Sequence, residues 1–281
     1  MEPLRRHRCH VAQSGVVRPA QRDLLTEEPL LIQIDERPVV TLMRTVGNEA
    51  ELALGYLLTE GIIRSPEAVA RIALGGDPPE GPNVVRVTLA DGADRETAAA
   101  PHRRVFSSCS VCGIEQIKEV ARGLCPFSPA PGRLTCAGIA ALARRMREGQ
   151  TYFQRTGASH AAALALRPLS EASLAQAIVR EDVGRHNALD KAVGAAAGGG
   201  FDFARCVLCL SSRLSFEMVA KAARAGIADV IGVSAPTTLA VDLAQRLGMF
   251  LAGFVRGDAF TVYSGMGALA TEKDRAHGQA D

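Results

Sequence analysis

Short apolar runs alternate with amphipathic segments of helical length along the second half of the chain. Helices are predicted where apolar residues recur every three or four positions, over 135–148, 187–197, 215–225 and 238–247. Strands are predicted where aliphatic residues run together without polar alternation, at 159–166, 177–181, 206–210, 230–233, 250–255 and 260–263. Apolar strands separated by helices predict an α/β domain whose parallel sheet is covered on both faces.

The first half of the chain follows a mixed α+β pattern. Strands are predicted over 30–34, 39–44 and 84–89, and a helix is expected to begin after Asn48 and to end at Gly61. A Pro-rich break follows, and we place the domain boundary there. The sequence thus predicts a flexible tail, a smaller α+β domain that contains a CxxC loop, and a larger α/β domain, over 1–28, 29–131 and 132–281.

The first 28 residues are predicted to be a solvated tail that is rich in arginine. They contain no apolar segment of the kind found in a secretory signal, and no stretch of about 20 apolar residues suggests a membrane span. The chain has seven cysteines, an odd number that fits a reducing compartment. We therefore expect a cytoplasmic protein without a membrane partner.

The composition excludes several classes of protein. The chain has 281 residues, of which 47% are hydrophobic and 22% are charged, so it is neither disordered nor fibrous. Its net charge of only +2 argues against general electrostatic capture of nucleic acid. Aromatic residues make up 4% and tryptophan is absent, so an aliphatic core is expected and platforms for base stacking are scarce.

Three strand-to-helix connections, at 181–187, 211–215 and 234–238, are rich in hydroxyl and arginine side chains. In an open α/β sheet, ligands bind beyond the carboxyl ends of the strands, where helix N-termini favour anions. The pattern predicts an anion site suited to phosphate groups. The candidate residues are Ser212, Arg213, Thr237 and Thr238. The alternative is that the hydroxyl residues only cap helices and that Arg213 is a surface residue.

Cys109 and Cys112 form a CxxC pair ahead of an amphipathic helical pattern, and Gly113 follows them. Near a helix N-terminus the helix dipole lowers a thiol pKa. One cysteine can then attack a disulfide or persulfide sulfur, and the other can resolve the product. The same spacing also suits half of a structural zinc site, which needs two further ligands. The spacing alone leaves both interpretations open.

A second CxxC pair, Cys206 and Cys209, lies inside a predicted strand. Side chains three positions apart in a strand point to opposite faces, so we expect two buried residues and no shared metal ion. His160 and His186 lie in polar, loop-like segments, and a structural role is the more common one for such histidines. No metal site is predicted.

Several motifs together carry a resemblance to a known family. They include the CxxC segment, TGASHAAA at 156–163, REDVGRHNALDK at 180–191, SAPTTLAVDL at 234–243 and GFVRG at 253–257. From about residue 29 to residue 263 the chain resembles the FdhD family, the accessory sulfurtransferases of formate dehydrogenase. Ser110 and Ile114 depart from the family motif, in which Gly and Lys are common at these positions.

The resemblance implies a cytidine-deaminase-like α/β domain with a mixed or parallel sheet beside the smaller α+β domain, and a homodimer. It implies that Cys109 receives sulfur from a cysteine desulfurase as a persulfide, with Cys112 as its partner. The sulfur then passes to the molybdenum bis(molybdopterin guanine dinucleotide) cofactor, a bound cargo destined for formate dehydrogenase. The implied contacts to the guanine dinucleotide are Phe254, Val255, Arg256, Gly257, Asp258 and Ala259.

Three other functions compete with this expectation. A zinc-dependent deaminase needs His-x-Glu and Pro-Cys-x-x-Cys motifs, and the sequence contains neither. A thiol–disulfide oxidoreductase shares the CxxC pair but leaves the three polar connections without a role. The main alternative is a non-enzymatic chaperone that binds the cofactor and holds structural zinc in its CxxC pair.

Overall fold

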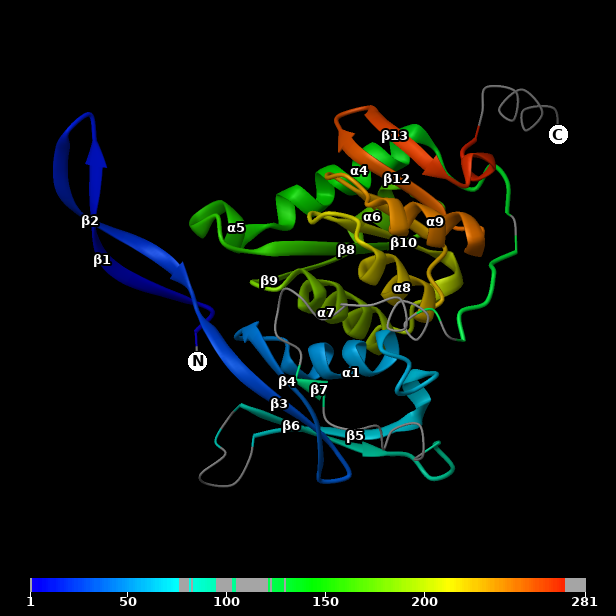
Figure 1. The fold of residues 1–281 in the computed structure, drawn as a ribbon, viewed down its shortest axis with the longest axis horizontal. Coiled ribbons are helices and arrows are strands. Elements are labelled where there is room, and N and C mark those ends of the chain that lie inside the picture. Colours follow the sequence, from blue (N-terminus) through cyan, green and yellow to red (C-terminus); the bar gives the residue numbers. More distant parts are fainter. Residues whose placement is uncertain are drawn as a thin grey trace.

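The computed structural model describes residues 2–75, 81, 83–94, 103–104, 121, 123–128 and 130–270. Figure 1 shows two sheets with helices between them, and a two-stranded ribbon that projects to one side. The smaller sheet has the order β5-β6-β3-β4-β7. Its strands are β3 (Glu27–Ile34), β4 (Arg37–Thr45), β5 (Val69–Leu74), β6 (Val84–Leu89) and β7 (Arg103–Arg104). The predicted strands of the first half are confirmed, while β5 and β7 were not predicted.

The larger sheet has six strands in the order β13-β12-β11-β10-β8-β9. They are β8 (His160–Leu166), β9 (Ile178–Asp182), β10 (Cys206–Leu210), β11 (Asp229–Gly232), β12 (Phe250–Arg256) and β13 (Ala259–Ser264). Only β10, β11 and β12 are parallel to one another, while β8, β9 and β13 pair antiparallel with their neighbours. The expectation of a parallel sheet is therefore wrong for half of the strands.

The lengths of the connections explain this mixed sheet. Residues 211–228 and 233–249 each include a helix and are long enough for a parallel crossover. By contrast, Gly257 and Asp258 alone join β12 to β13, and a two-residue connection forces an antiparallel hairpin. The resemblance of this domain to cytidine deaminases stays a prediction.

Helices cover both faces of the larger sheet and also separate it from the smaller one (Figure 1). One hydrophobic core lies between the two sheets and includes residues of α1, α7, α8 and α9. A second core lies on the far face of the larger sheet, under α4. The helices are α1 (Glu49–Thr59), α4 (Cys136–Gly149), α5 (Thr151–Thr156), α6 (Glu171–Ala175), α7 (Arg185–Gly198), α8 (Phe216–Arg224) and α9 (Thr238–Leu247). None of these helices is long and apolar enough to cross a membrane.

The predicted N-terminal tail is instead a β-hairpin. Strands β1 (Leu4–Gln13) and β2 (Val16–Leu25) pair along their full length, and Ser14 and Gly15 form the turn with positive φ angles. The hairpin projects away from the body, and Asp23 forms an ion pair with Arg155 of α5 at 2.8 Å. The pattern of polar residues concealed these strands, because neither face of the ribbon is buried. The Ser-Gly turn between valines was the available signal.

Helices α1 and α7 pack so closely that their backbones touch. A Cβ atom built at Gly55 of α1 would lie 1.7 Å from the carbonyl oxygen of Asp190, and one built at Gly194 of α7 would lie 1.8 Å from that of Glu51. No side chain can occupy either position without moving a helix. These two glycines therefore fix how the smaller sheet, through α1, sits on the larger one.

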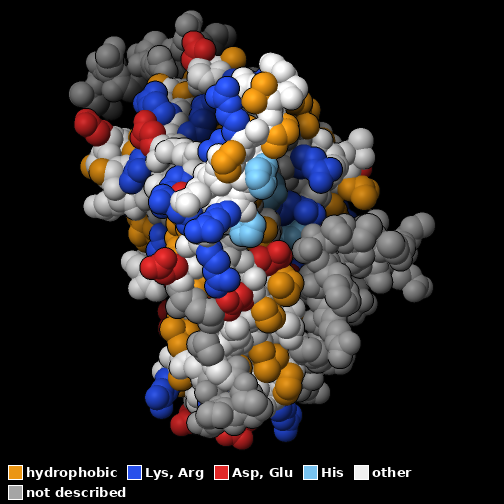
Figure 2. All heavy atoms as spheres, turned by 90° about the vertical axis from the view of Figure 1, so that its left-hand side faces the viewer, with side chains coloured by type: hydrophobic (Ala, Val, Ile, Leu, Met, Phe, Trp, Pro, Cys, Tyr) orange, Lys and Arg blue, Asp and Glu red, His pale blue; other side chains and the backbone are white. Residues whose placement is uncertain are grey.

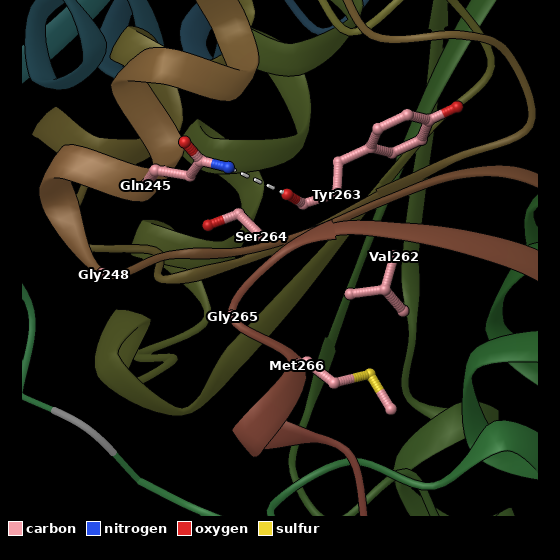
Figure 3. A pocket seen from close by; sticks show the side chains of 7 residues that line it. All are labelled: Gln245, Gly248, Val262, Tyr263, Ser264, Gly265 and Met266. Atoms are coloured by element: carbon pink, nitrogen blue, oxygen red, sulfur yellow. Dashed lines mark hydrogen bonds between the residues drawn. The ribbon is translucent and has the colours of Figure 1, made fainter.

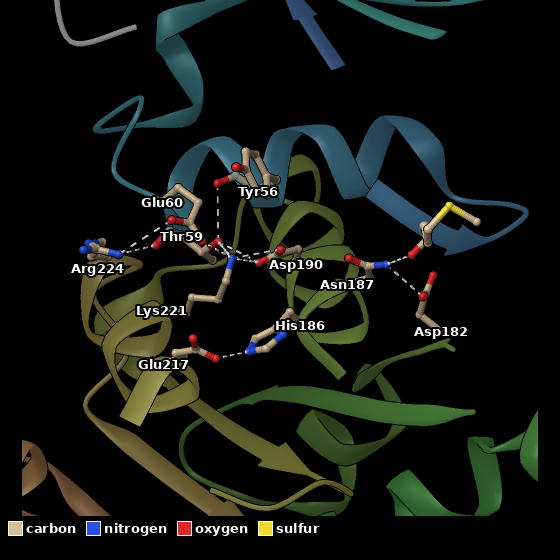
Figure 4. A network of polar contacts seen from close by, with 11 residues as sticks. Tyr56, Thr59, Glu60, Asp182, His186, Asn187, Asp190, Glu217, Lys221 and Arg224 are labelled. Carbon is tan, nitrogen blue, oxygen red and sulfur yellow. Dashed lines mark hydrogen bonds and ion pairs between the residues drawn. The ribbon is translucent and has the colours of Figure 1, made fainter. Parts of the chain in front are cut away.

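Buried polar bonds flank this contact on both sides (Figure 4). On one side, Lys191 contacts Asp182 at 2.7 Å and donates to the Thr45 carbonyl at 2.8 Å. On the other, the Lys221 ammonium lies 3.0 Å from both oxygens of Asp190 and 2.8 Å from Glu60. Burial by itself disfavours the charged ammonium, but these two carboxylates outweigh it, and the pKa of Lys221 is raised.

We expect Gly194→Ala to lower the free energy of unfolding by about 3 kcal/mol or more, because the added methyl group must push α1 away from α7. Gly198→Ala is the matched control. Its Cβ would meet nothing within 4 Å, so the same change at the end of the same helix should alter stability by less than about 1 kcal/mol. Urea unfolding of both variants measures the difference. Equal stabilities would contradict the proposed role of the glycine contact.

Candidate functional site

The carboxyl ends of β10, β11 and β12 meet at one edge of the larger sheet, and backbone hydrogen bonds tie the connections there together. The amide of Ser211 donates to the Ala161 carbonyl at 3.0 Å, and the amide of Leu214 donates to the Ala235 carbonyl at 3.0 Å. Strand β12 joins them near its C-terminal end, since the Phe254 amide donates to the Ser234 carbonyl at 3.1 Å. The connections at 211–215 and 234–238 therefore form one continuous surface.

This edge carries several basic side chains. Figure 2 shows arginine or lysine side chains and histidines on the side of the molecule toward which the β1–β2 hairpin projects, and the hairpin contributes arginines and histidines of its own to this view. Burial lowers the pKa of His160, and the positive charges of Arg185 and Arg213 lower it further. His160 begins β8, Arg185 begins α7, and Arg213 follows β10, so the fold brings together residues from three separate segments. These positive charges favour binding of an anion. We call this surface the basic edge; it comprises His160, Arg185, Arg213, the connections at 211–215 and 234–238, and the end of β12.

His186 also lies here, paired with a carboxylate of α8. Its Nε2 atom is 2.8 Å from a carboxylate oxygen of Glu217. This contact lowers the pKa of Glu217, and Arg185, whose guanidinium is 3.9 Å from the same carboxylate, adds to the effect. His186 therefore already has a partner within the protein.

Phe254 has an unusual backbone conformation at the end of β12. Its φ angle is +56°, a region that bulky residues rarely occupy, and its side chain is 41% exposed. The register between β12 and β13 shifts between Gly253 and Arg256. A Cβ built at Gly253 would lie 2.9 Å from the Ser234 carbonyl, so close packing against that loop holds the strand in place. The result is an aromatic ring turned outward at the basic edge.

The predicted contacts to the dinucleotide fall into two groups. Val255 is fully buried, so it lies beneath the surface that its neighbours present. The remaining residues are exposed, and Gly257 adopts a positive φ angle in the turn. These exposed residues are Phe254, Arg256, Gly257, Asp258 and Ala259.

The predicted hydroxyl contacts are partly engaged within the protein. Ser212 is 4% exposed and donates to the Arg213 carbonyl at 3.1 Å. The Thr237 hydroxyl accepts from the Ala240 amide and so caps α9, as the alternative interpretation expected. Thr238 and Arg213 are exposed at the edge. Cys109 and Cys112 lie outside the described residues.

Comparison with known proteins assigns the chain to a family. The model of the FdhD/NarQ family matches residues 25–270. The chain belongs to the FdhD/NarQ family. A sulfur carrier protein FdhD of Anaeromyxobacter dehalogenans is 42% identical, over 92% of this chain and 91% of that protein. One of Mycolicibacterium paratuberculosis is 40% identical, over 92% and 96%.

The fold also matches a solved structure of a candidate formate dehydrogenase accessory protein from Desulfotalea psychrophila. The TM-score is 0.71 at 23% identity, with 94% of this chain and 97% of the other covered. This similarity confirms that the arrangement of sheets and helices is one seen in a crystal structure.

The REDVGRHNALDK segment of this FdhD/NarQ protein acts mainly within the fold. Asp182 is fully buried and accepts from the Thr45 amide at 3.0 Å, while Arg180 bonds Glu51 at 2.8 Å. Glu181 accepts from the amides of Tyr152 and Phe153 at 2.7 and 2.9 Å, and so holds the start of α5. Within this segment, Arg185 and His186 are the residues that contribute charge to the basic edge.

A separate hollow of about 400 Å³ lies between the C-terminal end of α9 and β13 (Figure 3). It is lined by Gln245, Gly248, Tyr263 and Met266 among others, and none of its lining residues in the described part of the chain carries a charged side chain. It adjoins the end of the β12–β13 hairpin that is opposite to Gly257. The hollow is therefore distinct from the basic edge and unsuited to phosphate groups.

The second CxxC pair is buried, as predicted. Cys206 packs into the core between the sheets, while Cys209 packs into the core under α4, so the two thiols lie on opposite faces of β10. Burial raises the pKa of each thiol to about 12. Among the described residues, no group of three or more His, Cys, Asp or Glu side chains could hold a metal ion.

We expect iodoacetamide at pH 8 to modify the exposed Cys125 and Cys136 in the folded protein and to leave Cys206 and Cys209 unmodified. A thiol pKa raised from 9.0 to about 12 lowers the thiolate fraction by about 1,000-fold, and burial also blocks access. Peptide mass spectrometry before and after unfolding in urea measures the modification. Labelling of Cys209 in the folded protein would contradict this assignment.

Proposed function

We propose that this protein carries sulfur on Cys109 and delivers it to the molybdenum of a bis(molybdopterin guanine dinucleotide) cofactor destined for formate dehydrogenase. Relatives over nearly the whole chain are named sulfur carrier proteins, and the structural neighbour is a candidate formate dehydrogenase accessory protein. The observation that carries the proposal is the basic edge with the outward Phe254 ring. An exposed aromatic ring beside arginines suits a nucleotide, which has a flat base and phosphates.

Sulfur loading is a transfer between thiolates. The Cys109 thiolate attacks the outer sulfur of a cysteine desulfurase persulfide, forming a new S–S bond. The bond between that sulfur and the desulfurase cysteine breaks, and the desulfurase leaves as a thiolate. Cys109 then carries the persulfide, and no net oxidation or reduction occurs.

Delivery to the metal requires two electrons, because the carried sulfur leaves as sulfide. The Cys112 thiolate supplies them when it attacks the Cys109 sulfur and forms a Cys109–Cys112 disulfide. The bond to the outer sulfur breaks, and sulfide departs with the electron pair toward the molybdenum of the cofactor. A thiol reductant must then reduce the disulfide before the next cycle.

The basic edge would hold one guanine nucleotide half of the cofactor. Phe254 offers a face on which the guanine can stack, and the carboxylate of Asp258 can accept hydrogen bonds from the guanine ring N–H and amino group. Arg213 and Arg256, both exposed, would neutralise phosphate charge. Thr238, at the start of α9, adds a hydroxyl and the helix N-terminus.

We expect Cys109→Ala to abolish sulfur loading, because the variant lacks the thiolate that we propose attacks the desulfurase persulfide. The measurement is the mass of the protein after incubation with cysteine desulfurase and cysteine, and activation of formate dehydrogenase provides the second readout. Cys125→Ala, which changes an exposed cysteine, should still gain sulfur. Sulfur gain by Cys109→Ala would overturn the assignment. So would one zinc ion per chain bound by Cys109 and Cys112, which would favour the chaperone.

We expect Phe254→Ala to weaken binding of guanosine diphosphate by about tenfold or more, because stacking of one base on an aromatic ring contributes about 1–3 kcal/mol. Phe153→Ala removes a similarly exposed ring from α5 and should leave the affinity unchanged. Isothermal titration calorimetry compares the two variants with the parent protein. Equal affinities for all three proteins would place the nucleotide elsewhere.

A further inference from the structure

His160 lies at the basic edge, and its imidazole makes no polar contact in the described part of the chain that would explain it as a structural residue. It is the first residue of β8 and is half-buried, in register with Asp182 of β9. Among the described residues, no side-chain hydrogen bond or ion pair involves its imidazole ring, whereas His186 is paired with Glu217. His160 is therefore the histidine at this edge that is available to a ligand.

The backbone brings charged residues of neighbouring segments beside His160, because the Ser211 amide donates to the carbonyl of Ala161, the next residue in β8, at 3.0 Å, and His160 pairs in register with Asp182 of β9. Arg185 and His186 belong to α7, Arg213 belongs to the connection after β10, and Asp182 belongs to β9. Lys191 lies 2.7 Å from Asp182 and offsets its charge. Burial, and then the positive charges of Arg185 and Arg213, lower the pKa of His160 and so disfavour the protonated imidazole.

We propose that His160, Arg185 and Arg213 form a phosphate-binding site in which His160 takes up a proton as the diphosphate group of a nucleotide binds. A phosphate oxygen would accept a hydrogen bond from the imidazolium, and the proton would come from solvent without any change in covalent bonds. The inference deepens the proposed function, on which it rests, because it names the part of the ligand that this portion of the edge holds.

The physical reason is a reversal of the local field. Before binding, two arginines disfavour a third positive charge on His160. A diphosphate group neutralises them and adds negative charge beside the imidazole, which then gains more from carrying a proton. By linkage, any rise in the histidine pKa on binding must appear as tighter binding at lower pH.

The test follows the imidazole signals of the full-length protein by NMR across pH 5.5–8.5, without ligand and with saturating guanosine diphosphate. His160→Gln assigns the resonance, and His10 in the projecting hairpin serves as an internal reference. We expect the pKa of His160 to rise by at least about one unit, which corresponds to a tenfold preference of the ligand for the protonated protein. The pKa of His10 should not move.

A second readout separates this role from a purely structural one. His160→Gln should flatten the dependence of guanosine diphosphate affinity on pH between 6 and 8, while His10→Gln should retain the slope of the parent protein. Guanosine has no phosphate, and it should leave the His160 signal unchanged. An unaltered slope in His160→Gln would overturn the inference.

The outcomes distinguish this inference from the proposed function. Saturation by guanosine diphosphate, seen at the Phe254 amide, with no change in the His160 pKa would overturn the inference and leave the nucleotide site intact. Absence of guanosine diphosphate binding would count against the nucleotide site. In that case the NMR titration is repeated with inorganic pyrophosphate. A rise in the His160 pKa would support the phosphate site, and an unchanged pKa would refute it.

Discussion

The close contact between α1 and α7 is the constraint on which the arrangement of this protein depends. Gly55 and Gly194 let the two helix backbones touch, and this contact fixes the position of the smaller sheet relative to the larger one. The same helix α7 begins with Arg185 at the basic edge. The position of this charge is therefore set by packing some ten residues further along the same helix, where α1 holds α7 in place.

Buried charges around this contact contribute more to specificity than to stability. Removing these charges from water costs energy that the contacts within the Asp182–Lys191 and Asp190–Lys221 pairs only offset. A buried charge without its partner would strongly destabilise the fold, so these pairs disfavour any other packing of α1 on α7. This explains why a segment as polar as REDVGRHNALDK is mostly occupied within the fold: Asp182, Asn187 and Lys191 bond to the smaller domain.

The basic edge has the opposite character, because its charges are not fully matched within the protein. Phe254 is held in a strained backbone conformation and points outward, and the pKa of His160 is lowered by burial and by the positive charges of Arg185 and Arg213. Such features cost stability and are typical of sites that are organised for a ligand before it arrives.

The local pattern of residues determined most of the elements, because apolar periodicity and helix caps act over a few residues. It predicted α1, the α7–α9 helices and all six strands of the larger sheet, and it placed Cys206 and Cys209 in the interior. It missed the N-terminal hairpin, whose exposed faces have no apolar alternation. Strand direction, the meeting of His160 with Arg185 and Arg213, and the outward turn of Phe254 depend on contacts between distant segments. Only the tertiary structure decided these features, because no local preference encodes which segments meet.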